Sequence, residues 1–125
     1  MNLLVLKQPL LTEEYTQVLV DMDSVKFNAP HHFFVVKSEK HEDGQQDVVT
    51  EVHFQEGPIK EHGVNGCNNE DLINMVICRL ESFQRSDYAC KENQEAIDKL
   101  SEALMWLRLR TLKREQRNVE GTSAV

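Results

Sequence analysis

The sequence is poor in cysteine, in aromatic residues and in long apolar runs. Its three cysteines, at positions 67, 78 and 90, are odd in number and lack CxxC spacing, which favours reduced thiols over a disulfide framework. No run approaches the ~18 apolar residues that a membrane span requires. The stretch MNLLVLKQPLLTEEY lacks the basic start and the small-residue cleavage site of a signal peptide. We therefore expect a protein that acts in a cytoplasm, without a membrane segment.

Positive charge is also scarce, and it is unevenly distributed. The 125 residues hold 14 Lys and Arg against 21 Asp and Glu, a formal net charge of −7, which argues against binding to long nucleic acids. Residues 1–78 hold 5 basic and 13 acidic residues, whereas residues 103–117 hold five basic residues and one acid. A local cationic site on an acidic chain suits a small anion better than a long polyanion.

The first half of the chain has β-strand patterns, and its length and its 40% hydrophobic content suit one compact domain with a small appendage. The segments YTQVLVDM, HHFFVV and DVVTEVHF are rich in β-branched and aromatic residues. Asp43-Gly44 lies between the last two and is a strong hairpin-turn signal. These segments predict a small antiparallel sheet whose apolar face needs a cover.

The second half predicts two helices. The segment QEGPIKEHGVNG interrupts regular structure, because Gly57-Pro58 turns the chain and Gly63 and Gly66 permit positive φ. Asn68 or Asn69 can cap a helix over about 69–84, with Leu72, Val76, Leu80 and Phe83 along one face. A short loop leads to a longer helix over about 90–117. We expect an α+β fold with a β-rich part, residues 1–66, and a helical hairpin with its tail, residues 67–125.

The longer helix carries two apolar stripes. One steps through Ile97, Leu100, Leu104 and Leu107 and reaches Asn93 when it is extended backwards. The other, formed by Met105, Leu109 and Leu112, lies on a different side. Because one hairpin partner covers one stripe, the second stripe predicts contact with the sheet or with another copy of the chain.

A third line on this helix gathers Trp106, Arg110, Lys113 and Arg117. Its simplest interpretation is a solvated basic face, favoured by the helix dipole near a C-terminus. The functional alternative is that arginine forks hold phosphate oxygens, which match their planar donors.

Asn93 and Phe83 allow two interpretations as well. An amide on an apolar stripe is costly unless it is hydrogen-bonded, so Asn93 either fixes the register of the hairpin or reads a buried polar ligand. Phe83 is either the last core residue of the first helix or an aromatic plane for a base. Together they form a plausible base-reading pair at the closed end of the hairpin.

Neither catalysis nor metal binding is predicted from spacing. The five histidines have no standard ligand spacing with one another or with the cysteines, and no GxSxG or P-loop motif occurs. Lys60, in the glycine-containing loop, could still meet a phosphate. A small nucleotide-hydrolysing enzyme and a purely structural helical oligomer remain as alternatives to a binding protein.

Several short sequence segments, taken together, resemble a known protein family. HFQEGPIKEHGVNG, NEDL, ACKEN, KLSEALMWLRLRT and VEGT resemble the helical-hairpin domain of phage proteins that sequester immune signalling nucleotides. With APHHF and the β-rich part included, the chain resembles the first family of Thoeris anti-defence proteins. The resemblance is dense from His53 to Thr122.

This resemblance implies a fold, an assembly and a ligand. It implies a sheet packed on a helical hairpin, and dimers that associate into hexamers. It implies binding of cyclic ADP-ribose-type signals, especially glycocyclic forms, in the cytoplasm of the host cell and without degradation or cofactors. Related hairpin proteins bind the cyclic di- and trinucleotides of CBASS immunity, and members of this family can bind trinucleotides at a separate site.

The resemblance also implies roles for single residues. It places Phe83 against an adenine with Asn93 beside it, and it places Arg110 and Lys91 near the phosphates of a trinucleotide. Arg114 and the loop around Lys60 are further ligand-binding candidates. Two positions depart from the family pattern: Lys91 stands where arginine is frequent and loses the bidentate fork, and Asn118 stands where glycine is common, which we expect to be a turn variation.

Overall fold

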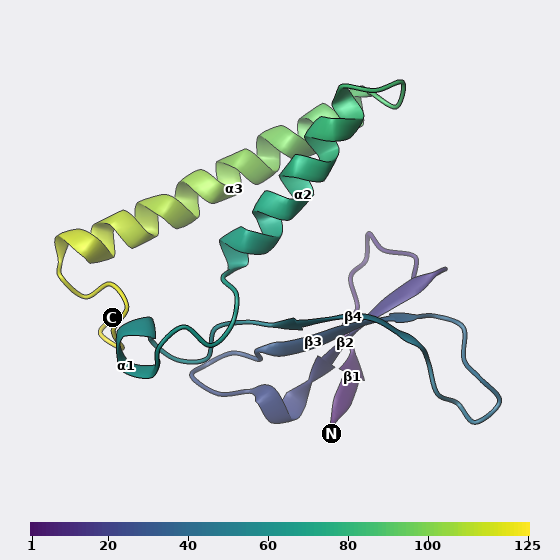
Figure 1. Cartoon of the computed structure of the whole chain (residues 1–125), viewed down its shortest axis with the longest axis horizontal. Coiled ribbons are helices and arrows are strands. Elements are labelled where there is room, and N and C mark those ends of the chain that lie inside the picture. The colour runs from purple at the N-terminus through teal and green to yellow at the C-terminus, as the bar shows by residue number, and fades with distance from the viewer. The chain divides into compact units, whose positions relative to one another are not determined.

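The computed structural model covers residues 1–125 and contains two compact units (Figure 1). The sheet unit comprises Met1–Gly57 and His62–Gly66, and the helical unit comprises Pro58–Glu61 and Cys67–Val125. None of the helices combines the length and the apolar content needed to cross a membrane.

The sheet unit is a four-stranded antiparallel meander. The β-strand patterns correctly predicted a small antiparallel sheet but left its strand count and order open. Its strands are β1 (Leu3–Val5), β2 (Thr16–Asp21), β3 (His32–Lys37) and β4 (Val48–His53), and they lie side by side in chain order. A single 3-10 turn, η1 (Met22–Ser24), links β2 to β3. The sequence patterns missed β1, because its three residues are exposed and its strand geometry comes from pairing with β2 rather than from local alternation.

The turn between β3 and β4 was predicted correctly. Gly44 has φ +84°, which glycine adopts without strain. The loop is closed by hydrogen bonds from Lys37 N to Asp47 O (2.9 Å) and from His41 N to Gln45 O (2.8 Å). Val20, Phe34 and Val36 are buried in the sheet and form the small core of this unit.

The glycine-containing connection is more regular than expected. It contains a short helix, α1 (Ile59–His62), between Gly57 and Gly63, both of which have positive φ. Gly66 does not have a positive φ. A Cβ at that position would lie 2.4 Å from the carbonyl carbon of Phe54, so the glycine provides space for a close backbone approach.

The helical unit is built on an antiparallel hairpin of α2 (Asn69–Gln84) and α3 (Lys91–Gln116), close to the predicted bounds. Asn68 is the N-cap of α2, and its backbone N–H donates to Asp71 Oδ2 at 2.8 Å. At the other end of the hairpin, α3 is followed by Asn118 with φ +58°, and Val119 N donates to Arg114 O at 3.0 Å. Asn118 therefore ends α3 in the left-handed conformation that glycine adopts most easily, as the expected turn variation requires.

The two helices pack through one stripe each. On α3, Ile97 is buried and Leu100, Leu104 and Leu107 are half-buried, as predicted. On α2 the predicted face was wrong at Val76, whose surface is 46% exposed, whereas Ile77 is buried. Leu72 and Ile73 are both half-buried, so the buried face of α2 includes Ile77 rather than Val76.

Candidate functional site

The closed end of the hairpin is held by hydrogen bonds across its loop. Gln84 Nε2 donates to Cys90 O, and Cys90 N donates to Gln84 Oε1, both at 2.9 Å. Inside this pair of bonds, Ser86 N and Ser86 Oγ both donate to Phe83 O, at 3.0 and 2.6 Å. The end of α2 and the start of α3 are thus fixed relative to each other, which gives the side chains around them a defined geometry.

Phe83 lies half-buried in this end, between a cation and a second aromatic ring. The guanidinium carbon of Arg79 lies 5.1 Å from the centroid of the Phe83 ring, within the range of a cation–π contact. The ring of Tyr88 meets the Phe83 ring edge-on, with a centroid distance of 6.4 Å and an interplanar angle of 78°. The Phe83 ring therefore contacts one cationic side chain and one aromatic side chain, which hold its orientation at the closed end.

Asn93 is attached to the same loop through a weak bond. Its Nδ2 donates to Tyr88 O at 3.5 Å, the outer limit of a hydrogen bond, and its side chain is half-buried. A primary amide offers two donors and two acceptor lone pairs. Most of this capacity is free, as the recognition of a base edge would require.

Lys91 is the first residue of α3 and is exposed. The N-cap residue before it, Cys90, makes no capping bond with its side chain. A lysine here is opposed by the positive end of the helix dipole, so it adds no stability in this position and its ammonium extends into solvent beside free helical N–H groups.

Arg110 is exposed on the second half of α3 and is free of ion pairs within the chain. The ion pair on this helix joins Arg108 Nη1 to Glu115 Oε1 at 3.3 Å. Lys113 is exposed nearby, and Trp106 has 64% of its surface exposed. The basic line predicted from the sequence therefore faces solvent in a single chain.

Arg114 is placed differently, because its guanidinium is half-buried and holds the C-terminal tail. Its Nη1 donates to Ala124 O at 2.7 Å, and its Nη2 donates to Val119 O and Thr122 O at 2.9 and 3.0 Å. Three of its five donors are occupied in this way. In this structure, the hydrogen bonds of Arg114 hold the C-terminal tail in place.

Lys60 lies on α1, beside the same tail (Figure 1). Its Nζ is 3.6 Å from Glu120 Oε2, and its backbone N donates to Gly121 O at 2.8 Å. A Cβ on Gly121 would lie 2.8 Å from Lys60 Cγ, so glycine is required for this approach. Lys60 and Arg114 therefore both contact the C-terminal tail.

The predicted ligand residues consequently fall into separate groups along α3. Phe83, Asn93 and Lys91 lie at the closed end, whereas Lys60 and Arg114 lie at the other. A rise of 1.5 Å per residue puts Lys91 and Arg110 roughly 28 Å apart along the axis. One chain therefore does not bring all the predicted residues around one small ligand.

Two neighbours of Phe83 were missed by the sequence patterns. Arg79 precedes Phe83 by four residues, so helical spacing alone puts the two side chains on one face. Tyr88 lies in the loop, where no periodicity applies.

In the sheet unit, the side chains of His32, Glu51 and His53 come together as possible metal ligands, which spacing along the chain did not reveal.

Comparisons with known proteins agree with the motifs in the helical unit and extend beyond them. Residues 46–111 match the family described as the Acb2/Tad1 hairpin domain. A protein of Bacillus phage SBSphiJ7, Thoeris anti-defense 1, is 48% identical over 136 aligned residues, which cover 94% of this chain and 96% of that protein. The relative therefore matches both the β-rich part and the hairpin.

Proposed function

Because the chain belongs to the Thoeris anti-defense 1 family, we propose that it is a phage protein that sequesters a signalling nucleotide of Thoeris immunity. The ligand class is a cyclic ADP-ribose-type molecule, such as glycocyclic ADP-ribose. The protein acts in the host cytoplasm, holds the signal intact and so keeps it from the host effector.

The observation that supports this proposal most is the closed end of the hairpin. An aromatic ring, Phe83, and an amide with unused donors and acceptors, Asn93, are connected there through Tyr88. Adenine needs a flat surface and partners for its edge. We propose that Phe83 stacks on the adenine, that Asn93 bonds its edge, and that Arg79 holds the ring of Phe83 or meets a phosphate.

A second site takes cyclic di- or trinucleotides through Lys91 and Arg110. The two cations lie roughly 28 Å apart on one helix, so one small cyclic nucleotide meets both only if they come from different copies of the chain. We therefore propose that this site is formed between copies. Dimers that associate further, to a hexamer, would also cover Met105, Leu109 and Leu112, which are exposed in a single chain.

Lys60 and Arg114 have a supporting part in this proposal. Arg114 fixes the C-terminal tail, and the tail fixes Lys60 through Glu120 and Gly121. Because the Lys60 side chain remains 60% exposed, its ammonium can bind a ligand phosphate. The two free donors of Arg114 can add to that contact.

The gross interaction energies are on the scale that capture requires. Nanomolar affinity requires ~12 kcal/mol. A base stack contributes ~1–3 kcal/mol, and each hydrogen bond to a charged group contributes ~1.5–3 kcal/mol. One stack and several phosphate contacts reach this scale before the cost of ordering the ligand is subtracted, so binding needs no chemical step.

Recovery of the ligand distinguishes this proposal from its alternatives. The purified protein is incubated with glycocyclic ADP-ribose, freed of unbound ligand by gel filtration, and heated; mass spectrometry then identifies what is released. Intact ligand is expected. Altered ligand would mean a nucleotide-hydrolysing enzyme, and no retained ligand would mean a structural helical oligomer.

A further inference from the structure

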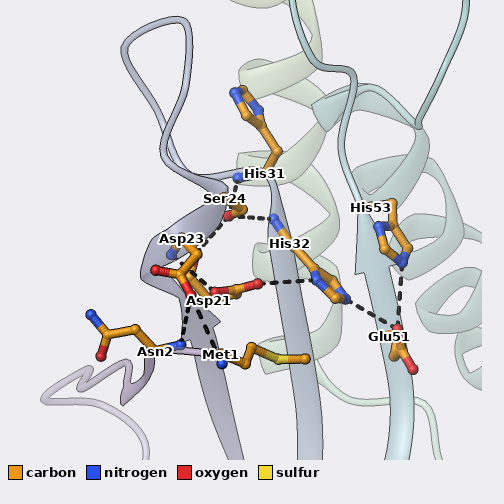
Figure 2. A network of polar contacts seen from close by, with 9 residues as sticks. All are labelled: Met1, Asn2, Asp21, Asp23, Ser24, His31, His32, Glu51 and His53. Atoms are coloured by element: carbon orange, nitrogen blue, oxygen red, sulfur yellow. Dashed lines mark hydrogen bonds and ion pairs between the residues drawn. The ribbon is translucent and has the colours of Figure 1, made fainter.

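Three side chains of the sheet unit converge on one face of the sheet. His32 on β3 pairs directly with His53 on β4, and directly paired residues of an antiparallel sheet project to the same side. Glu51 lies two residues before His53, so strand alternation puts it on this side as well. Figure 2 shows both imidazoles directed at the Glu51 carboxylate.

The spacing of the donor atoms suits a metal ion. His32 Nε2 lies 3.0 Å and His53 Nε2 lies 3.4 Å from the same oxygen, Glu51 Oε2. The three candidate ligand atoms all lie within 4.8 Å of one another. Bonds of about 2.0–2.1 Å to a tetrahedral ion separate neighbouring ligand atoms by roughly 3.3 Å. Small side-chain movements would therefore admit an ion between them.

A buried carboxylate lies near the second ring nitrogen of His32. Asp21, with 8% of its surface exposed, directs Oδ2 toward His32 Nδ1 at 3.6 Å, and its Oδ1 accepts a bond from Asp23 N at 2.9 Å. In the structure His32 Nε2 is hydrogen-bonded to Glu51, so an ion that binds Nε2 requires the imidazole proton to reside on Nδ1. A carboxylate near Nδ1 favours that tautomer. Figure 2 shows this chain of contacts from Asp21 through His32 to Glu51.

The ligand positions are also fixed by packing. The His32 ring stacks on the His53 ring, with centroids 4.0 Å apart, and contacts the Phe34 ring at 4.3 Å. The side chain of Ser24 accepts bonds from the backbone N–H groups of His31 and His32, which fixes the start of β3.

We propose that His32, Glu51 and His53 bind one divalent transition-metal ion of the zinc class, with a fourth position open to water. Two imidazole nitrogens and one carboxylate oxygen are a donor set that zinc accepts, whereas magnesium and calcium prefer oxygen ligands alone. The ion would join β3 to β4 within the sheet unit. This proposal opposes the sequence-based expectation of no metal site and is independent of nucleotide binding.

The test is a titration of the tag-free protein with Zn²⁺ by calorimetry and with Co²⁺ by visible absorption. The background carries Cys67→Ser, Cys78→Ser and Cys90→Ser, because free thiols bind both ions. We expect one ion per chain, and saturating Zn²⁺ should raise the Tm by roughly 5–10 °C. His53→Ala and Glu51→Gln should each weaken Zn²⁺ binding more than tenfold.

Two further variants separate a metal site from a general histidine effect. Asp21→Asn should weaken Zn²⁺ binding by about 10–100-fold while the stoichiometry of one ion is kept. His41→Ala is the matched control, because His41 also pairs with a carboxylate, Asp47, but lacks a third ligand. It should bind Zn²⁺ as the parent does.

Three results would overturn the proposal. They are the absence of stoichiometric Zn²⁺ binding in the cysteine-free background, equal affinity in a folded His53→Ala variant, and an equal loss in His41→Ala. Circular dichroism on each variant identifies those that remain folded. If His53→Ala unfolds, Glu51→Gln decides the outcome, since that substitution removes charge without changing volume.

Discussion

The sheet unit and the helical unit treat their charged side chains in opposite ways. Seven of the nine close contacts between basic groups and carboxylates lie within the sheet unit: four use histidines, and three use Lys7, Lys37 or the N-terminus. The helical unit holds ten of the 14 Lys and Arg residues, yet only Lys60 and Arg108 are ion-paired there. Two of the four lysines of the sheet unit are ion-paired, whereas eight of the ten cations of the helical unit have no ion pair.

This difference separates two kinds of binding capacity. In the sheet unit, ligand atoms are already assembled on one face, which suits a small ion that enters between them. In the helical unit, exposed cations lie along a 26-residue helix, which suits ligands and partners brought from outside the chain. Substitutions that act in one unit should therefore leave the function of the other unchanged.

The largest expected effect is on assembly. Leu109→Glu puts a charge in the exposed stripe that contains Met105 and Leu112, and burial of an unpaired charge in an interface is strongly unfavourable. We expect sedimentation at micromolar concentration to detect an assembly larger than a dimer for the parent and a smaller one for this variant, with helical content unchanged. Lys99→Glu, at an exposed polar position on α3, is the control and should keep the parental size. A monomeric parent would contradict the oligomer.

The next effect concerns the cyclic trinucleotide site. Arg110→Ala should weaken trinucleotide binding by ~1.5–3 kcal/mol, the scale of one hydrogen bond to a charged group, with little change in stability because Arg110 is exposed. Arg108→Ala is matched to it, since Arg108 lies two residues away and is paired with Glu115. Calorimetry on both variants checks the difference. Equal affinities would remove Arg110 from the site.

Mixing variants tests whether this site is formed between copies. Lys91→Ala and Arg110→Ala chains, each deficient alone, should recover part of the binding when they are unfolded and reassembled together. A site contained in one chain would give no recovery. Lys91→Arg restores a bidentate fork and should hold or improve the affinity.

A smaller effect is expected at the closed end of the hairpin. Phe83→Leu and Asn93→Leu keep apolar volume but remove stacking or hydrogen bonding, and each should lose ~1–3 kcal/mol of affinity for glycocyclic ADP-ribose. If these residues are only structural, Asn93→Leu should be neutral or stabilising and capture should survive. Phe27→Leu, at an exposed phenylalanine of the sheet unit, is the matched control. Parental affinity in both folded hairpin variants would refute this pocket.

The two long helices were predictable from sequence to within a residue or two, because helices are encoded locally, whereas the short helix α1 was missed. Asn68, the apolar spacing and the loop after Gln84 mark the two helices without any knowledge of the rest of the fold. The error at Val76 arose because Val76 and Ile77 both fit helical spacing, and only their burial in the fold distinguishes them. The strand β1 was missed because pairing, not pattern, creates it.

The same distinction applies to the sites. Phe83, Asn93 and Arg110 could be selected from helical spacing and from the family resemblance, and the ligand roles of all three remain predictions. The cluster of His32, Glu51 and His53 could not be selected, since its geometry depends on the register between β3 and β4. Spacing along the chain carries no information about that register until the strands are paired.

The smallest expected effect is on the pH dependence of the sheet unit, at a pair exposed to solvent. His41 Nε2 lies 2.8 Å from Asp47 Oδ1 in the loop between β3 and β4, and Lys37 Nζ lies 3.7 Å from Oδ2. The hydrogen bond to Asp47 raises the pKa of His41 from its ordinary value of 6.5. The same bond lowers the pKa of Asp47 from 3.8.

The signs define a pH window for this pair. A raised histidine pKa gives stability that is complete below pH 6.5 and is lost as pH rises through the folded-state pKa. A lowered aspartate pKa gives stability that is present above pH 3.8 and is lost as pH falls. Asp47→Asn should therefore return the pKa of His41 toward 6.5 in an NMR titration, and should lower the Tm slightly at pH 5.5 but not at pH 9. An unchanged His41 titration in this variant would mean that the pair does not form in solution, and that the contrast between the two units is smaller there than the structure indicates.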